Sequence, residues 1–292
     1  MYNQIAANKR KTWLLIGSVG LLLAVLVWLV GRAYGLDIYS AAAFGILFST
    51  SYAVVSYFTG DKAALAVARA RQIQKSDAPE LWNIVENLSI AEGLPMPRLY
   101  LSDDPSPNAF ATGRSAKTSS LCFTTGLLRI LEKNELEGVA AHELSHVKNL
   151  DIRVATIVVI LIGAIALIAD IFLRGAFLGG GRRRDNNDSA SIFVIIGLLF
   201  AILAPLAAQL IQLAISRQRE YLADASGALL TRYPEGLASA LQKIEDASLR
   251  STHANRATAH LYFTNPFGSV KTLLSTHPPI EKRIERLRSM GA

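Results

Sequence analysis

The chain alternates between long uncharged apolar runs and polar stretches. Residues 12–30, 38–59 and 189–216 contain no charged residue. Each run has the length of a membrane-spanning helix, which needs about 20 mostly apolar residues. A fourth run, residues 154–173, contains Asp170 and is marginal by the same criterion. The pattern predicts a membrane protein with four apolar segments.

The first two runs lie close together near the N-terminus. A cleaved signal peptide also has an apolar run there, but it needs a short apolar core and a small-residue cleavage site. The run at residues 12–30 is long, and a second run follows at once. We therefore predict an uncleaved transmembrane hairpin within residues 1–59.

Basic residues flank these two runs mainly on one side, since only Arg32 lies in the link between them, alongside Asp37. Lys9, Arg10 and Lys11 precede the first run, and four lysines and arginines follow the second within residues 62–75. Because Lys and Arg accumulate on the cytoplasmic side of membrane proteins, the N-terminus and the chain from residue 60 onwards are expected in the cytoplasm.

The charge of the loop at residues 174–190 disagrees with this rule if the loop lies outside the cell. It carries four arginines, so it violates the same rule if both flanking segments span and the loop lies outside. If neither segment spans, the loop lies inside. In both cases the number of crossings is even, and residues 60–150 and 217–292 share one side.

Composition agrees with a membrane protein, because 51% of the residues are apolar and only 18% are charged. The net charge of +7 could indicate nucleic-acid binding. No basic stripe with interleaved aromatics occurs, however, and the basic residues beside the apolar runs explain the balance better. No nucleic-acid partner is expected. The single cysteine, Cys122, excludes an intrachain disulfide and is expected to be a buried small residue.

The polar stretch after the second run has the pattern of a small folded domain. Residues 77–92 are typical of an amphipathic helix, with Asp77 as N-cap, Glu80 as capping-box acid and Gly93 at its end. Three short strands bounded by Pro, Gly and Ser are predicted at residues 97–104, 108–113 and 119–128.

A second helix is expected to start at Asn134, with Glu137 as its capping-box partner. It carries HELSH, in which His142 and His146 are four residues apart and share one helix face. Two imidazoles can then reach one zinc ion, and Glu143 can serve as general base. The alternative is a helix with two ordinary histidines. A chance HExxH has a probability below roughly 1 in 100 in a chain with so few histidines, so zinc is favoured.

Catalytic zinc takes three protein ligands and a water, so the site needs one more residue. The candidates are His253, His260, His277 and acidic residues on the same side of the membrane. Glu220 is favoured, because it shares one face of an expected helix with Asp224, which can hold a ligand histidine from behind. The alternative is an exposed charged turn in which Glu220 is only solvated.

Several stretches resemble, in order, the M48 family of membrane metalloproteases. They are NAFATG at residues 108–113, HELSH at 142–146, EYLAD at 220–224 and STHPP at 275–279. The resemblance covers nearly the whole chain. It implies that Glu220 is the third ligand of one Zn²⁺ per chain. It also implies a zincin-like protease domain that faces the cytoplasm from a bacterial inner membrane, with a role in quality control of misfolded membrane proteins.

Two further roles follow from this resemblance. An edge strand can hold an extended peptide, and residues 108–113 are the candidate, with Asn108 and Ala109 nearest the site. The alternative is an internal strand. His277 matches the family's H-P motif and is expected to donate a hydrogen bond to the oxyanion or to hold the substrate backbone. The alternative is a turn whose histidine hydrogen-bonds only locally.

The expected fold class is mainly α with a small β-sheet, in a membrane-anchored zincin-like metalloprotease. Its parts are a hairpin (1–59), a first protease part (60–150), two membrane segments (151–216) and a second protease part (217–292). The predicted function is zinc-dependent endopeptidase, acting on polypeptides, above all membrane proteins, at the lipid bilayer. The alternative is a non-catalytic scaffold or transporter with a regulatory zinc, but polar groups in mid-span are few.

Overall fold

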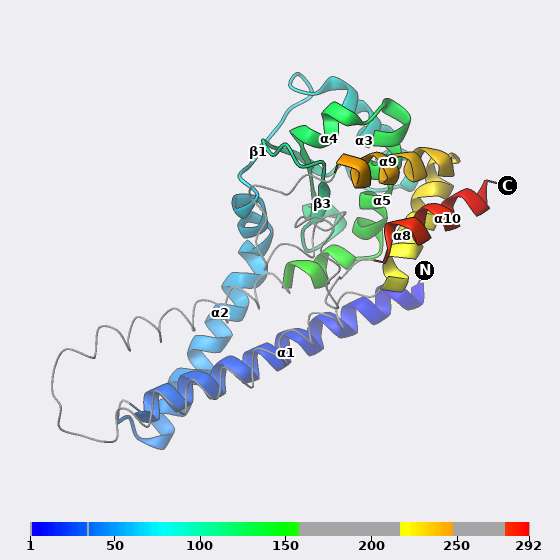
Figure 1. Cartoon of the computed structure of the whole chain (residues 1–292). Helices are drawn as coiled ribbons and strands as arrows, with labels where there is room; N and C mark the ends of the chain where they lie inside the picture. Colours follow the sequence, from blue (N-terminus) through cyan, green and yellow to red (C-terminus); the bar gives the residue numbers. More distant parts are fainter. Residues whose placement is uncertain (1, 34, 158–216, 248–277, 292) are drawn as a thin grey trace.

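The computed structural model describes residues 2–33, 35–157, 217–247 and 278–291. Two long helices, α1 (Tyr2–Ala33) and α2 (Ile38–Val67), form a hairpin that projects from a body of shorter helices and one sheet (Figure 1). The expected fold class, mainly α with a small sheet, is therefore confirmed for the described residues.

The hairpin agrees with the predicted pair of spans. Within the described residues, two helices are long and apolar enough to cross a membrane, over Asn8–Leu29 and Ile38–Val67. A Cβ added at Gly45 of α2 would lie 2.6 Å from a backbone oxygen of α1, so this glycine lets the two helices touch. The predicted segments at residues 154–173 and 189–216 lie almost wholly outside the described residues.

The sheet has four strands in the order β1-β2-β4-β3, with β2 and β4 parallel and the other pairs antiparallel. Their bounds are β1 Ala70–Gln72, β2 Arg98–Ser102, β3 Ala109–Thr112 and β4 Ser120–Thr124. Among the described residues, strand β3 lies at an edge of the sheet, which agrees with the edge position expected for residues 108–113. Strand β1 at the other edge was not predicted.

The third predicted strand, residues 119–128, is wrong in its second half. Helix α4 (Thr125–Ile130) follows β4 directly, and Thr124 caps it by accepting a hydrogen bond from the N–H of Leu127. Gly126 lets the start of this helix approach the preceding loop closely, since a Cβ there would lie 2.1 Å from the carbonyl oxygen of Pro105. A local apolar pattern does not reveal this close approach of two backbones.

Helix α3 (Pro79–Glu92) confirms the predicted amphipathic helix, and Gly93 ends it with a φ of 68°. The predicted N-cap is wrong, because Ala78 holds that position without a side-chain cap bond. The Asp77 carboxylate instead accepts a hydrogen bond from the N–H of Gln74. It closes the preceding turn and is not available to α3.

The remaining elements are a short 3-10 helix, η1 (Ala116–Thr118), and the helices α5 (Lys133–Lys148), α8 (Arg217–Thr231), α9 (Pro234–Ala247) and α10 (Ile280–Met290). Helix α10 begins directly after Pro278 and Pro279. Helix α5 lies in the middle of the body and contacts β3, α3, α8 and α9 (Figure 1).

Helix α5 starts earlier than predicted. Glu132 is its N-cap and forms a reciprocal capping box with Glu135, rather than the predicted Asn134 with Glu137. Both pairs have the same spacing along the chain. Contacts from α9 to the Glu135 carboxylate distinguish them, so the start of the helix is selected by tertiary packing.

Close packing fixes α5 against its neighbours. Most of its side chains are buried, including Val139, Ala140 and Leu144, which are fully inaccessible to solvent. A Cβ at Gly138 would lie 2.8 Å from the backbone nitrogen of Leu237 in α9. A helix held this tightly presents its polar residues in a defined direction.

Candidate metal centre

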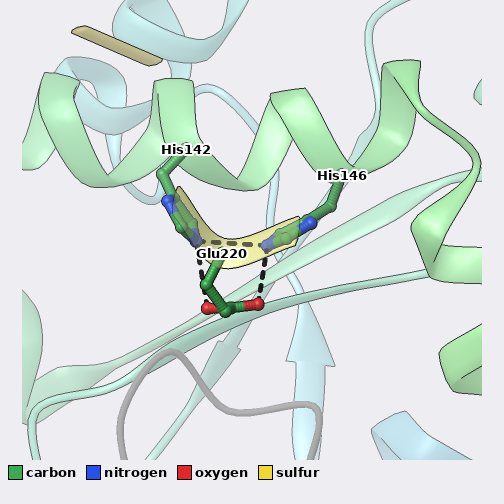
Figure 2. Close-up of side chains that lie close together, drawn as sticks. All are labelled: His142, His146 and Glu220. Carbon is green, nitrogen blue, oxygen red and sulfur yellow. Dashed lines mark hydrogen bonds and ion pairs between the residues drawn. The ribbon is translucent and has the colours of Figure 1, made fainter. Parts of the chain in front are cut away.

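His142 and His146 of α5 face Glu220 of α8 across the contact between the two helices (Figure 2). The Nε2 atoms of the two histidines lie 3.1 Å apart. The Glu220 carboxylate is 3.9 Å from Nε2 of His142 and 3.6 Å from Nε2 of His146. Glu220 is 6% exposed, which excludes the alternative of a solvated charged turn.

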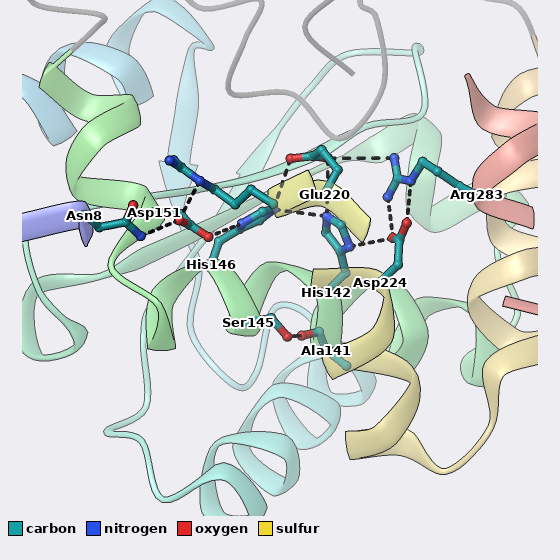
Figure 3. Close-up of polar contacts among 10 residues, drawn as sticks. Asn8, Ala141, His142, Ser145, His146, Asp151, Glu220, Asp224 and Arg283 are labelled. Carbon is teal, nitrogen blue, oxygen red and sulfur yellow. Dashed lines mark hydrogen bonds and ion pairs between the residues drawn. The ribbon is translucent and has the colours of Figure 1, made fainter. Parts of the chain in front are cut away.

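The opposite nitrogen of each ring faces a carboxylate (Figure 3). Nδ1 of His142 lies 3.0 Å from Asp224, and Nδ1 of His146 lies 3.1 Å from Asp151. An ionised carboxylate only accepts hydrogen bonds, so each Nδ1 carries the proton and each Nε2 keeps its lone pair. Two lone pairs directed at one another at this distance need a cation between them.

This geometry fits a metal ion. Tetrahedral zinc with nitrogen bonds of about 2.0–2.1 Å would hold two imidazole nitrogens roughly 3.3 Å apart, close to the 3.1 Å between His142 and His146. Within the described residues, these two histidines and Glu220 are the one group of potential ligands that converges, with all ligand atoms within 4.8 Å.

The pKa values of the two histidines are displaced in opposite directions. Burial lowers the pKa of His142 to about 4, although Asp224 opposes this shift. Burial acts in the same direction on His146, but the hydrogen bond to Asp151 and the charge of Glu220 outweigh it and raise the pKa to about 9. A metal ion binds this pair only when both Nε2 atoms are unprotonated, so its affinity should depend on pH.

Glu143 lies next to the ligands on α5 and is 3% exposed. Burial raises the pKa of its carboxyl group to about 7, with nearby Glu220 adding to the shift and His146 opposing it. The backbone of Ala111 in strand β3 favours the ionised carboxylate and lowers the pKa of Glu143 slightly against this shift. A carboxyl group with a pKa near neutrality can both accept and return a proton.

Arg283 of α10 completes the centre and was not among the residues predicted from the sequence. It is fully buried, and its Nε and Nη2 donate to the two oxygens of Asp224 at 2.8 and 2.7 Å. Its Nη1 also lies 3.9 Å from Glu220. Burial would raise the pKa of Asp224, but Arg283 and His142 together lower it to about 2. One signal was present, because Arg283 falls on the apolar stripe of its helix beside Ile284.

Asp151 is the second residue of the centre that the sequence patterns did not reveal. In the structure its carboxylate lies 3.1 Å from His146, and it also contacts Arg219 at 3.0 Å and Asn8 at 2.7 Å. No pattern in the sequence connects Asp151 with Asn8, 143 residues away.

The residues expected to bind substrate lie at the start of the edge strand. The N–H of Asn108 donates to Oγ1 of Thr124, and its carbonyl oxygen accepts from the N–H of Thr124. Ala109 pairs with Phe123, and both residues belong to the buried core. Cys122 is buried in β4, as expected. His277 lies outside the described residues, which resume at residue 278.

Known proteins match this chain over most or all of its length. Residues 75–291 match the model of peptidase family M48. A protease HtpX homolog of Tropheryma whipplei (strain Twist) is 50% identical over 100% of this chain and 99% of its own length. A protease HtpX homolog of Dictyoglomus thermophilum is 46% identical over 99% of this chain and 95% of its own length.

A solved structure also resembles the fold. The crystal structure of S. mikatae Ste24p matches with a TM-score of 0.51 at 18% identity, over 98% of this chain and 67% of that chain. The family match includes both α5, with its two histidines, and α8, with Glu220. The chain therefore belongs to peptidase family M48 and is a membrane metalloprotease.

Proposed function

We propose that this protein is a zinc-dependent endopeptidase that cleaves membrane proteins, with one Zn²⁺ per chain bound by His142, His146 and Glu220. The observation that carries the proposal is that the Nε2 atoms of His142 and His146 lie 3.1 Å apart, while the Nδ1 atom of each ring faces a carboxylate. Two histidines and one glutamate are a ligand set of catalytic zinc, which leaves a position for water.

The residues of the chain have separate tasks in peptide hydrolysis. Zinc, when bound, polarises the scissile carbonyl and lowers the pKa of water. Glu143 accepts the proton of the attacking water and returns it to the leaving amine, for which its pKa of about 7 is suited. Asp224 and Asp151 hold the two ligand rings from behind.

Strand β3 is the proposed support for an extended substrate. An edge strand can bind a peptide by pairing with its backbone. Strand β3 contacts α5, the helix that carries the general base Glu143. Asn108 and Ala109, at its start, are the proposed substrate-binding residues. His277 is proposed to donate a hydrogen bond to the oxyanion, held by the two prolines that precede α10.

The proposed location is a bacterial inner membrane, with the chain crossing more than once and residues 60–150 and 217–292 in the cytoplasm. Asn8, at the start of the first candidate span, touches Asp151 of the centre. The N-terminal end of α1 and the centre are thus on one side, and the basic residues at 9–11 favour the cytoplasm for it. A centre beside the end of a span suits membrane-protein substrates, as in quality control of misfolded ones.

Exchange of Glu143 for Gln tests the proposal. Glu143→Gln should keep its zinc and lose proteolysis of a membrane-protein substrate, because Gln has nearly the same size but cannot act as base. His142→Ala and Glu220→Ala should instead lower the zinc content of the purified protein. Full proteolysis by Glu143→Gln would exclude the mechanism, and wild-type protein without zinc would exclude the cofactor.

The side of the membrane on which residues 60–150 and 217–292 lie needs a separate experiment. Single cysteines at residues 100 and 240, in a chain without Cys122, should resist a membrane-impermeant thiol reagent added from outside the cell. Labelling at either position would contradict the cytoplasmic location without affecting the proposed chemistry.

A further inference from the structure

Asn8 occupies an unusual position for a residue at the end of a membrane helix. It is 4% exposed, whereas its neighbours Lys9 and Arg10 are exposed, as expected for the charged end of an anchor. Burial of an amide is unfavourable unless its donors and acceptor are hydrogen-bonded. Anchoring in a membrane does not explain a buried asparagine, so its contacts have to.

Both donors of the Asn8 amide point to the segment that follows the HExxH helix. Nδ2 lies 2.7 Å from Oδ1 of Asp151 (Figure 3). It also lies 2.8 Å from the carbonyl oxygen of Asn149, the C-cap of α5. An NH₂ group has two hydrogens, and these two acceptors use both. Asn8 therefore connects α1 with the end of α5.

The two oxygens of Asp151 have different partners. Oδ1 accepts from Asn8 and lies 3.0 Å from Nε of Arg219, while Oδ2 faces Nδ1 of His146 at 3.1 Å. Asn8 and Arg219 hold the carboxylate from one side, which leaves the other oxygen directed at the histidine. The orientation of His146 thus depends on Asn8, which lies 138 residues earlier in a helix that contributes no ligand of its own.

We propose that Asn8 is a positioning residue of the metal centre, which acts through Asp151 on His146. This inference rests on the proposed zinc function. In this arrangement α1 has two tasks, because it anchors the chain and its first turns complete the surroundings of a metal ligand. Zinc binding then requires that the N-terminal helix is docked on the protease body.

Zinc affinity of the full-length protein in detergent tests the proposal. Asn8→Ala should bind zinc about tenfold more weakly in competition with a chelator, at the lower end of the effect of groups that support metal ligands. Asn8→Asp should bind it more weakly still, because a second carboxylate would face Asp151. Lys9→Ala, the exposed neighbour on the same helix, is the matched control and should bind zinc like the wild type.

A double mutant separates positioning from a general effect on folding. In an Asp151→Ala background, the additional exchange Asn8→Ala should weaken zinc binding less than about twofold, since its effect passes through Asp151. The absorption spectrum of the Co²⁺-substituted Asn8→Ala protein should also differ from that of the wild type, because the His146 ring is less constrained. If Asn8→Ala does not fold, Asn8→Ser keeps a polar group at the position but cannot reach Asp151, and the same result is expected.

The outcomes distinguish failure of the proposed zinc function from failure of the proposed role of Asn8. If the wild type binds no zinc, the proposed function fails. If the wild type binds zinc and the Asn8 variants show the same affinity and the same cobalt spectrum, the role of Asn8 is excluded and the proposed function stands. A full tenfold loss of zinc affinity on adding Asn8→Ala to the Asp151→Ala background would also overturn the proposed role of Asn8, because Asn8 would then act by another route.

Discussion

Arg283 and Asp224 form a buried bidentate ion pair, with nitrogen–oxygen distances of 2.8 and 2.7 Å. The pair joins the C-terminal helix α10 to α8, and the same Asp224 carboxylate faces the ring of His142. Because a planar guanidinium binds both carboxylate oxygens at once, it restrains the carboxylate more than a point charge would. The last helix of the chain is thus part of the metal centre.

The first prediction is that Arg283→Met destabilises the protein by about 3–5 kcal/mol, because it leaves the Asp224 charge buried and unpaired. Arg283→Lys should have a smaller effect, since it keeps the charge but not the bidentate geometry. Thermal or denaturant unfolding of the purified protein measures both changes.

Arg288 provides the control for this prediction. It lies on the same helix and pairs with Glu235 at the surface, where its side chain is 54% exposed. Arg288→Met should change the unfolding free energy by less than about 1 kcal/mol. Equal effects of the two exchanges would contradict a special role for the buried pair.

The second prediction concerns the contact between α5 and α8 at Gly227. A Cβ there would lie 3.0 Å from the backbone nitrogen of His142. Gly227→Ala should therefore push α8 away from α5, cost about 1–3 kcal/mol of stability and weaken zinc binding, because Glu220 moves with its helix. Leu229→Ala, at a position 71% exposed, is the control. Unchanged zinc affinity in Gly227→Ala would show that α5 and α8 can separate without loss of the site.

The third prediction is a pH-dependent contribution of Glu135 to stability. Burial alone would raise its pKa, but hydrogen bonds from Lys243 and Ser239 lower it below the ordinary value of 4.5. A carboxyl group whose pKa is lower in the folded than in the unfolded state stabilises the fold at pH values above its unfolded-state pKa. This stabilisation is lost as the pH falls through the folded-state pKa. Glu135→Gln should thus be less stable than the wild type at pH 7, with the difference shrinking below about pH 4.5.

Unfolding measured at pH 7 and at pH 3 checks this expectation. Glu137→Gln, two residues further along α5, is the matched control and should resemble the wild type at both values. A stability difference for Glu135→Gln that is constant with pH would show that the carboxylate charge is not involved.

The fourth prediction follows from the proposed role of His277. His277→Ala should bind zinc normally and cleave roughly a hundred to a thousand times more slowly, which is the usual effect of losing one oxyanion donor. The loss should fall mostly on the maximal rate. Zinc analysis and cleavage rates of the same preparation are needed, because loss of zinc would identify His277 as a ligand. Cleavage at the wild-type rate would reduce it to a structural turn.

The sequence by itself determined which residues share a helix face. Helical geometry is local, so His142 and His146 at a spacing of four had to point the same way, as did Glu220 and Asp224. The apolar runs likewise determined the N-terminal hairpin, because the length of a span follows from bilayer thickness. These inferences needed no knowledge of how the elements pack.

Local rules were less reliable where two partners compete for one group. Asp77 fits the pattern of an N-cap, yet its carboxylate closes the preceding turn. The two possible capping boxes at the start of α5 have equal spacing, and contacts from α9 to Glu135 decided between them. Each cap is worth only about 1 kcal/mol, so one additional tertiary contact is enough to change the choice.

Only the tertiary structure decided what surrounds the ligands. Asn8 meets Asp151 across 143 residues, and Arg283 meets Asp224 across 59. Such pairs depend on the packing of α1, α8 and α10 about α5, and no periodicity along the chain relates their positions. The position of Arg283 on the apolar stripe of α10 was an unused signal that it needs a buried partner, because an unpaired buried charge is strongly unfavourable. Which carboxylate it would meet followed only from the fold.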